Sequence, residues 1–177
     1  MTKASEQIID EILVLDCQAG RAKAMEILVS RWHKRLWQHA YRLVGDTDAA
    51  WDITQQSWLA IIKGLRRLHE PAHFKAWAYR ITTSKAVDWI RKDRRRKRVS
   101  IEAIQDHQPK SVRDAGVREL LAKLDVKKQV VVSLYYFEEL SVTEISTALK
   151  IPKGTVRSRL HNAREELRAL WQESVDE

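Results

Sequence analysis

Residues 141–168, SVTEISTALKIPKGTVRSRLHNAREELR, have the pattern of two helices separated by a tight turn. Ser141 followed three residues later by Glu144 forms a capping box, which begins a short helix. Pro152 and Gly154 interrupt the pattern before a second helix starts. The stretch therefore predicts a helix-turn-helix, a motif that places its second helix in the major groove of DNA.

The second helix of this motif has one apolar and one polar face. Its apolar residues recur at spacings of four, three, four and three, so they form a stripe that faces a core: Val156, Leu160, Ala163, Leu167 and Leu170. The opposite face carries side chains that can reach phosphates and base edges: Arg157, Ser158, His161, Asn162, Arg164 and Arg168. The alternative is an ordinary amphipathic helix with a solvated charged face.

The positive charge of the chain is concentrated in its middle. The formal net charge is +8, yet residues 63–98 hold 13 Lys and Arg against 3 Asp and Glu, and the segments before and after are each net −1. Cations gathered in this way attract a polyanion and make its binding depend strongly on salt. A charge run can also be a solubilising face, so the run counts mainly because it accompanies the helix-turn-helix.

The composition favours an all-α fold and excludes several classes of protein. Only 5 Gly and 3 Pro occur in 177 residues, and long helical periodicities occur without alternating strand-like runs. The single Cys17 excludes an internal disulfide and a zinc-ligand cluster. No apolar run approaches the ~18 residues of a membrane span, and the N-terminus lacks a signal-peptide core. We therefore expect no membrane contact and a cytoplasmic location.

The apolar periodicity divides the chain into two helical domains. Helices are expected over 22–44, from the stop and capping residues 45–48 to about 64, and from about Phe74 into the basic run, with a loop over roughly 66–73. The polar residues 99–114 are expected to be a linker, so the predicted domains are 1–98 and 115–177. Expected core positions of the second domain include Val117, Leu120, Leu121, Leu124, Val130, Leu134 and Phe137.

Seven Trp residues are many for a chain of this length. Trp32, Trp77 and Trp171 fall at or beside apolar stripe positions, so we expect core packing rather than base stacking for each.

The helix that begins near Phe74 carries a row of polar side chains along one face. Its members are spaced by four, four, three and four residues, with Lys92 beside them: Arg80, Ser84, Asp88, Arg91 and Arg95. Such a row can contact phosphates and the edges of unpaired bases, and Tyr79 and Trp89 on its flanks could stack on a base. A solvated basic face that only neutralises phosphates is the alternative, and it retains nucleic acid as the partner.

Residues 24–98 and 120–171 resemble an extracytoplasmic-function sigma factor of bacterial RNA polymerase. The matching phrases lie in family order and with family spacing: AYRLVGD (40–46), DITQQSWL (52–59), FKAWAYRI (74–81), DWIRK (88–92) and LSVTEISTALKIPKGTVRSRLHNAREEL (140–167). The resemblance implies an N-terminal helical domain of sigma region 2 type and a helix-turn-helix domain of region 4 type. It also implies binding to core RNA polymerase and to promoter DNA, and regulation in many members by an anti-sigma factor.

The resemblance assigns polymerase docking to the helix expected at 47–64. Docking on the clamp helices of the β′ subunit would use Asp48, Asp52, Gln55, Gln56 and Leu59. The family more often has Glu at position 56 and an acidic residue at position 51, where this chain has Trp. We expect docking to survive because Asp52 and Gln55 remain.

The resemblance assigns recognition of the melted −10 element to the loop and the basic helix. The implied residues are Arg66, Arg67, His69, Phe74, Tyr79, Arg80, Ser84, Asp88, Arg91, Lys92 and Arg95. Ser84 stands where the family usually has an Asn that reads a flipped base, and a hydroxyl has fewer donors than an amide. Glu70-Pro71 replaces a frequent Gly and Asp, so we expect an altered −10 preference.

The resemblance assigns −35 recognition in the major groove to the second helix of the helix-turn-helix. The implied residues are Lys153, Thr155, Arg157, Ser158, His161, Asn162 and Arg164. Lys153 and the helix N-terminus near Thr155 are suited to hold a phosphate. Asn162 stands where the family usually has Arg, which removes one phosphate or guanine contact.

Two alternative functions remain open at this point: a free-standing helix-turn-helix regulator and a helical nucleic-acid-processing enzyme. The five glycines form no phosphate-binding loop, and the sequence contains no nucleophile elbow, which argues against the enzyme. His69 and His73 lack a third metal ligand, and Asp46, Asp48 and Asp52 are better explained by capping and docking than by magnesium. No cofactor or metal is expected.

Overall fold

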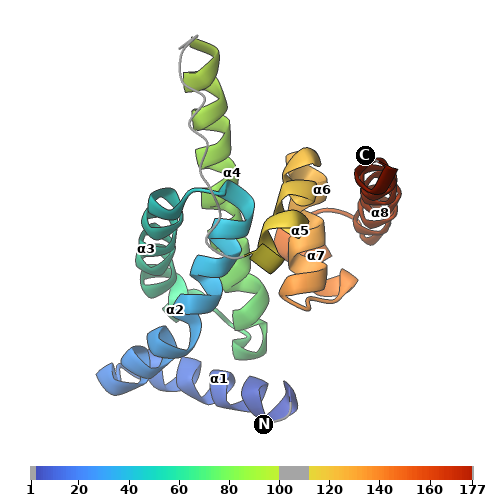
Figure 1. Cartoon of the computed structure of the whole chain (residues 1–177). Helices are drawn as coiled ribbons and strands as arrows, with labels where there is room; N and C mark the ends of the chain where they lie inside the picture. The colour runs from blue at the N-terminus through green and yellow to red at the C-terminus, as the bar shows by residue number, and fades with distance from the viewer. Residues whose placement is uncertain (1–2, 100–111, 177) are drawn as a thin grey trace.

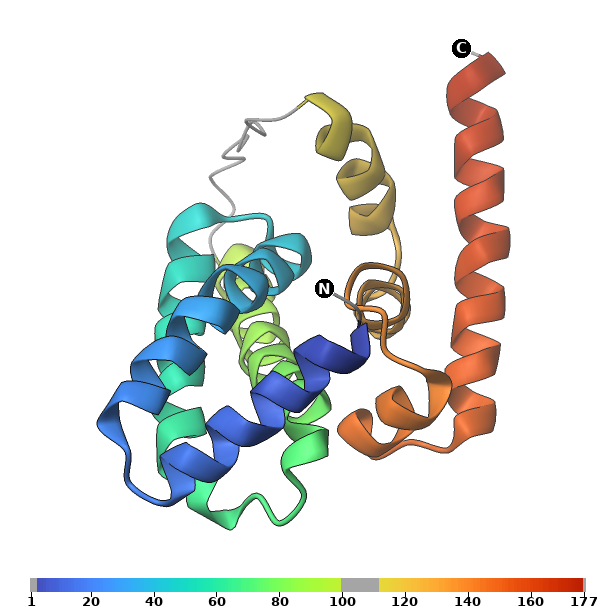
Figure 2. The same cartoon turned by 90° about the horizontal axis from the view of Figure 1, so that it is seen from below.

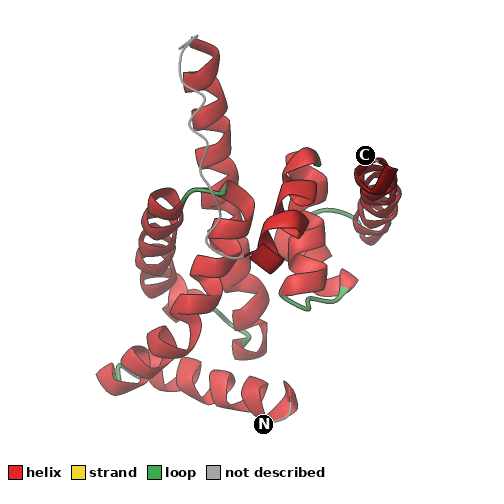
Figure 3. Ribbon diagram, viewed as in Figure 1, coloured by secondary structure: helices red, strands yellow, loops and turns green. Residues whose placement is uncertain are grey.

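The computed structural model describes residues 3–99 and 112–176, and these residues form helices and short connections only (Figure 1, Figure 3). The expected all-α fold is confirmed. None of the described helices combines the length and the apolar character needed to cross a membrane. The helices are α1 (Lys3–Gln18), α2 (Ala22–Val44), α3 (Thr47–Gly64), α4 (Phe74–Val99), α5 (Val112–Lys123), α6 (Val126–Val132), α7 (Val142–Leu149) and α8 (Lys153–Asp176).

Helix α2 is the centre of the N-terminal domain and packs against α1, α3 and α4. The apolar stripe of α2 is buried along its whole length: Leu28, Trp32, Leu36, Ala40 and Leu43. Trp32 is at its centre, with edge-on contacts to Phe74 at 5.3 Å and Tyr79 at 5.8 Å between ring centroids. Such contacts add ~0.5–1.5 kcal/mol per pair to the free energy of burial.

The connection between α2 and α3 is the stop and cap that its sequence predicts. Gly45 adopts a left-handed φ of 73°, and its N–H donates to the Tyr41 carbonyl at 2.8 Å. Asp46 then caps α3 by accepting a hydrogen bond from the Ala49 N–H at 2.7 Å. At the other end of α3, a Cβ on Gly64 would lie 2.9 Å from the Trp77 ring, so this glycine permits close packing of α3 on α4.

Helix α1 was not among the expected elements. Its inner face buries Leu13 and Val14, and Gln18 donates to the carbonyls of Leu65 and Leu68 at 3.0 and 2.8 Å. These bonds anchor the segment after α3, which forms two short 3₁₀ turns, Leu65–Arg67 and Pro71–His73, where an irregular loop over 66–73 was expected. The apolar spacing of Ile9, Leu13 and Cys17 was the available signal for this helix.

The C-terminal domain packs α8 against α5, α6 and α7. Leu121, Leu124, Val130 and Leu134 are buried as expected. Two expectations are wrong: Phe137 remains 37% exposed and Trp171 60% exposed. Trp171 lies near the C-terminal end of α8, and the last turns of this helix extend past the neighbouring helices (Figure 2).

The ends of the predicted linker are helical, since α4 ends at Val99 and α5 begins at Val112. Residues 100–111 of that linker lie outside the described residues. The two domains are in contact: α7 packs against α4, and α6 with the following π-helical turn η3 (Ser133–Phe137) packs against α2 (Figure 1).

Candidate nucleic-acid interface

The helix-turn-helix is formed by α7 and α8, and its capping box is present. The Glu144 N–H donates to the Ser141 hydroxyl at 3.2 Å, and the Ser141 N–H donates to the Glu144 carboxylate at 2.8 Å. Lys150 ends α7 in a left-handed conformation, and the Ser146 hydroxyl donates to the Ile151 carbonyl across the turn at 2.6 Å. These bonds determine the angle at which α8 leaves α7.

Helix α8 separates its two faces as the spacing predicts. Val156, Leu160 and Ala163 are buried, and Leu167 and Leu170 are half-buried. All six polar residues expected on the opposite face are exposed: Arg157, Ser158, His161, Asn162, Arg164 and Arg168. Lys153 at the helix start is also exposed, whereas Thr155 is half-buried and its carbonyl accepts a bond from the Ser158 hydroxyl at 3.1 Å.

Helix α4 presents the expected polar row to solvent. Arg80, Ser84, Asp88, Arg91 and Arg95 are all exposed, as is Lys92 beside them. The opposite side of α4 is anchored in the core by Ala78, Thr82 and Ala86. A carboxylate oxygen of Asp88 lies 3.9 Å from a guanidinium nitrogen of Arg91, so the row contains an exposed ion pair. Such a pair contributes little to the free energy of unfolding.

Part of the α4 row lines a cleft of about 440 Å³ between the domains, whereas none of the polar α8 residues named above lines it. Helix α4 contributes Arg80, Ser84, Asp88 and Arg91, and the C-terminal domain contributes Lys127, Lys150 and Arg159 among its polar residues. Asp88 is the only acidic residue in this lining. The cleft is therefore strongly cationic and suited to an anionic ligand.

Two residues expected at the −10 surface are core residues in this structure. Phe74 is 1% exposed and Tyr79 2% exposed, because both rings pack on Trp32. Burial, followed by the nearby negative charge of Glu138, raises the pKa of Tyr79. Neither ring is available for stacking on a base in this arrangement, whereas Arg66, Arg67 and His69 are exposed in and after the first 3₁₀ turn.

The exposed face of α3 carries all five residues expected at the polymerase surface: Asp48, Asp52, Gln55, Gln56 and Leu59. Trp51, Leu59 and Ile62 are all about half exposed on the same helix. Trp51 extends this face towards α2, since its ring lies 5.3 Å from His33 and 5.8 Å from Trp37. Sequence reasoning identified neither Trp51 nor Ile62 as a candidate contact, although their exposed positions continue the spacing of Leu59.

Comparison with known families accounts for both domains. Residues 28–96 match the family model for sigma-70 region 2, and residues 115–167 match the model for sigma-70 region 4. The chain belongs to the extracytoplasmic-function sigma factors of the sigma-70 family. This sigma factor is thus a transcription initiation factor and not an enzyme. A free-standing regulator does not explain a region 2 match alongside a region 4 match.

Individual relatives agree with this assignment. The chain is 32% identical over 155 residues to the ECF RNA polymerase sigma factor SigE of Mycolicibacterium smegmatis, spanning 80% of this chain and 59% of SigE. It is 28% identical over 167 residues to the ECF sigma factor SigW of Bacillus subtilis, spanning 84% of this chain and 89% of SigW.

A solved structure shares the fold of this sigma factor. The sigma factor RpoE of Bartonella quintana, determined in complex with the anti-sigma factor NepR, superposes with a TM-score of 0.73 at 20% identity. The match covers 85% of this chain and 98% of that one. At this identity the likeness supports the fold.

Proposed function

We propose that this sigma factor divides its work among three surfaces and uses them on core RNA polymerase. The exposed face of α3 docks on the β′ clamp helices, the polar row of α4 holds the melted −10 strand, and α8 reads the −35 duplex. The observation that best supports the division is the separation of two exposed polar surfaces, one in each domain, from the exposed face of α3, which mixes carboxylates and amides with Trp51, Leu59 and Ile62.

For docking, we assign the contact to Asp48, Asp52, Gln55, Gln56 and Leu59. Asp52 and Gln55 supply acceptors and a donor for a polar partner helix, and Leu59 supplies apolar area. An Asp52→Ala variant should lose co-elution with purified core polymerase. Glu26→Ala removes an exposed carboxylate that pairs only within its own helix, and this control should co-elute as the wild type does.

For the −35 element, we assign base contacts to Arg157, Ser158, His161 and Asn162, and phosphate contacts to Lys153, Thr155 and Arg164. Each phosphate neutralised by a cation steepens the salt dependence of binding by ~0.9 in the log–log slope. A Lys153→Ala variant should therefore reduce that slope by about 1 and weaken binding to all sequences alike. Arg157→Ala should instead relax preference at one position of the element.

For the −10 element, we assign the single strand to Arg66, Arg67, His69, Arg80, Ser84, Asp88, Arg91, Lys92 and Arg95. The guanidinium groups neutralise the backbone, and Ser84 offers a single hydroxyl to a flipped base. Phe74 and Tyr79 are left out because the core holds them. A chain with this function acts in the cytoplasm, and the anti-sigma complex of a structural relative makes an anti-sigma factor a partner to test for.

Reconstitution with purified core polymerase tests the whole proposal. Promoters are first located by sequencing the transcripts induced when the chain is overexpressed, since shared upstream elements identify the consensus. The chain should then direct core polymerase to these start sites and open the promoter, while binding the same duplex poorly alone. A chain that neither co-elutes with core polymerase nor opens a promoter in its presence would refute the proposal.

A further inference from the structure

The cleft of about 440 Å³ beside α4 gathers positive side chains from both domains, and we call it the cationic cleft. Its charged lining consists of Arg80, Asp88 and Arg91 of α4, Lys127 of α6, Lys150 directly after α7, and Arg159 of α8. Five cations thus accompany one carboxylate. An excess of one charge in a concave site raises the local concentration of ions of the opposite sign.

The cations of this cleft lack the carboxylate partners that neutralise other cations of the chain. No described residue forms an ion pair with four of the five: Arg80, Lys127, Lys150 and Arg159. The adjacent Lys128, which does not line the cleft, pairs with Asp125 at 3.2 Å and with Glu166 at 2.6 Å. The side chains that line the cleft are therefore available to an anion from solution.

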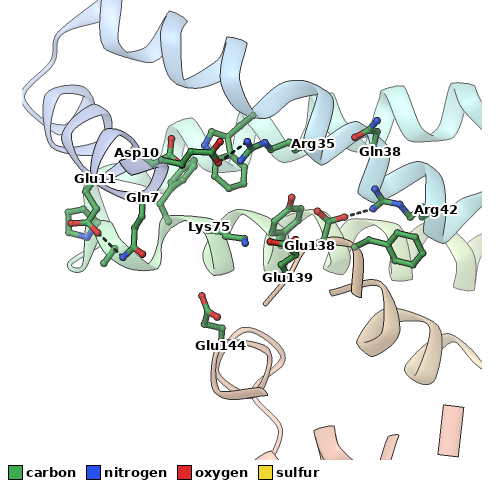
Figure 4. Close-up of a pocket in the computed structure, with 17 residues that line it drawn as sticks. Gln7, Asp10, Glu11, Arg35, Gln38, Arg42, Lys75, Glu138, Glu139 and Glu144 are labelled. Atoms are coloured by element: carbon green, nitrogen blue, oxygen red, sulfur yellow. Dashed lines mark hydrogen bonds and ion pairs between the residues drawn. The ribbon is translucent and has the colours of Figure 1, made fainter. Parts of the chain in front are cut away.

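A second cleft between the domains, of about 410 Å³, has the opposite arrangement of charge (Figure 4). Carboxylates outnumber cations in its lining: Arg42 donates to Glu138, and Arg35 pairs with a carboxylate of α1, Glu6, at 3.1 Å. The Arg42 guanidinium also lies over the Phe137 ring, 4.7 Å from its centroid, which explains why this ring is not in the core as expected. The boundary between the domains does not as such collect unpaired cations, so the charge of the cationic cleft indicates a ligand.

The cationic cleft has the size and the apolar wall of a small-molecule site. Its volume lies within the range of roughly 300–1,000 Å³ that such sites occupy. Four half-buried aliphatic side chains form its wall: Val87, Val126, Leu149 and Ile151. Ser84 adds a hydroxyl and Asp88 a carboxylate, which can bond to ribose hydroxyls or to the amino group of a base.

These groups together select one class of ligand. Adjoining phosphates present several negative charges close together, and Lys and Arg bind phosphate through charge-assisted hydrogen bonds. An inorganic anion would leave the aliphatic wall and the Asp88 carboxylate unused, whereas an uncharged nucleoside would leave the cations unused. A nucleoside that carries a polyphosphate uses both parts of the lining.

We propose that the cationic cleft binds a nucleoside polyphosphate, with its cations on the phosphates and its aliphatic wall against the nucleoside. Four residues of the cleft also belong to the proposed −10 surface: Arg80, Ser84, Asp88 and Arg91. A bound nucleotide therefore competes with single-stranded −10 DNA for this part of α4. Binding of the nucleotide is independent of the proposed function, whereas the competition rests on it.

Isothermal titration calorimetry of the full chain, at an ionic strength of about 0.15 M, tests the site. The probes are ATP, GTP and CTP, together with inorganic tripolyphosphate, which carries the charge without a nucleoside. Lys127→Gln and Lys150→Gln each remove one charge from the lining. Lys123→Gln removes the same charge from an exposed position on α5 outside the lining, and it is the matched control.

At least one nucleotide should bind the wild type saturably, with one site per chain. Each lining variant should weaken this binding at least about fivefold, because a phosphate charge about 4 Å from an ammonium group has that effect even in bulk water. Lys123→Gln should bind as the wild type does, and tripolyphosphate should bind more weakly than the nucleotide. Circular dichroism identifies any variant that unfolds, and the remaining lining variant then decides the outcome.

Three results would overturn the site: no saturable binding of any nucleotide, binding unchanged in the folded lining variants, or an equal loss in Lys123→Gln. The last result would mean that the net charge of the chain attracts the nucleotide. Tripolyphosphate that binds as tightly as the nucleotides would overturn the assignment of the aliphatic wall to a nucleoside.

Displacement of a labelled single-stranded DNA of mixed sequence tests the competition. The nucleotide should displace this DNA from the wild type, and a higher nucleotide concentration should be needed with Lys127→Gln. If the nucleotide binds with the expected variant pattern but does not displace the DNA, the nucleotide site stands and the assignment of the α4 row to single-stranded DNA fails.

Discussion

The capping box of the helix-turn-helix offers a prediction whose magnitude follows from three hydrogen bonds. Ser141→Ala removes the bond that the hydroxyl accepts from the Glu144 N–H at 3.2 Å and the one that it donates to the Glu144 carboxylate at 2.7 Å. The third bond joins the backbone N–H of Ser141 to the Glu144 carboxylate at 2.8 Å, and it remains because it does not involve the Ser141 side chain. Only part of the box is therefore lost.

We expect a loss of about 1 kcal/mol in the free energy of unfolding, near the middle of the range for N-cap Ser replaced by Ala. The loss is not larger because the capping residue is exposed and water can replace the lost partner. It is not negligible because α7 has only eight residues, so its first turn is a large part of the helix. About 1 kcal/mol lowers Tm by about 4–8 °C in a domain of 60–100 residues.

Urea denaturation followed by circular dichroism measures this loss. Ser158→Ala is the control, since its hydroxyl bonds to the Thr155 carbonyl within an exposed turn of α8 and caps no helix. Ser141→Asp should retain the wild-type midpoint because a carboxylate also accepts at this position. Equal midpoints for Ser141→Ala and wild type, or an equal loss in Ser158→Ala, would contradict the assigned role of the capping box.

Three further predictions concern the DNA surfaces, the packing of α4 and the effect of pH. Arg157→Ala should weaken binding at −35-dependent promoters by ~1–3 kcal/mol, and Ser84→Ala should chiefly change −10 selectivity. Start-site use in reconstituted transcription measures both effects. Unchanged start-site use in both variants would refute the assignments. Gly64→Ala should destabilise the N-terminal domain by ~1–3 kcal/mol in urea denaturation, because the new methyl group would lie 2.9 Å from the Trp77 ring; no change in midpoint would mean that the ring moves away freely. The pKa of Glu138 is below the ordinary value of 4.5, so its contribution to stability is present above pH 4.5 and is lost as pH falls through the lower, folded value; the free energy of unfolding of the wild type in urea should decrease in that acid range, and Glu138→Gln should lack this component.

The helices of the N-terminal domain illustrate why most of the architecture could be read from residue spacing. A stripe such as Leu28, Trp32 and Leu36 has the period of one helix face, and a Gly-Asp pair after it supplies a stop and a cap. These signals are local, so they need no knowledge of the partner helix. The helix α1 was missed because its apolar residues are flanked by exposed Ile8, Ile12 and Leu15, which obscure the stripe.

The nucleic-acid surfaces were accessible to the same reasoning where their residues lie on one helix. The exposed row of α4 and the polar face of α8 follow from helical geometry once the buried stripe is known. Aromatic residues were harder to assign, because a ring can belong to a core or a binding surface at the same spacing. Tyr79 is held in the core by Trp32 and His39, whereas Trp171 is left exposed near the end of its helix.

Residue order alone therefore specified the helices, their caps and the polar faces that they present, because each depends on residues within a few positions of one another. The arrangement of the two domains depends on atoms far apart in the chain: Arg42 and Glu138 are separated by 96 residues, and His39 and Ser133 by 94. No periodicity relates such positions. A buried carboxylate acquires its partners only when three-dimensional packing brings them together, and this is why closure of the domains became visible only in the folded molecule.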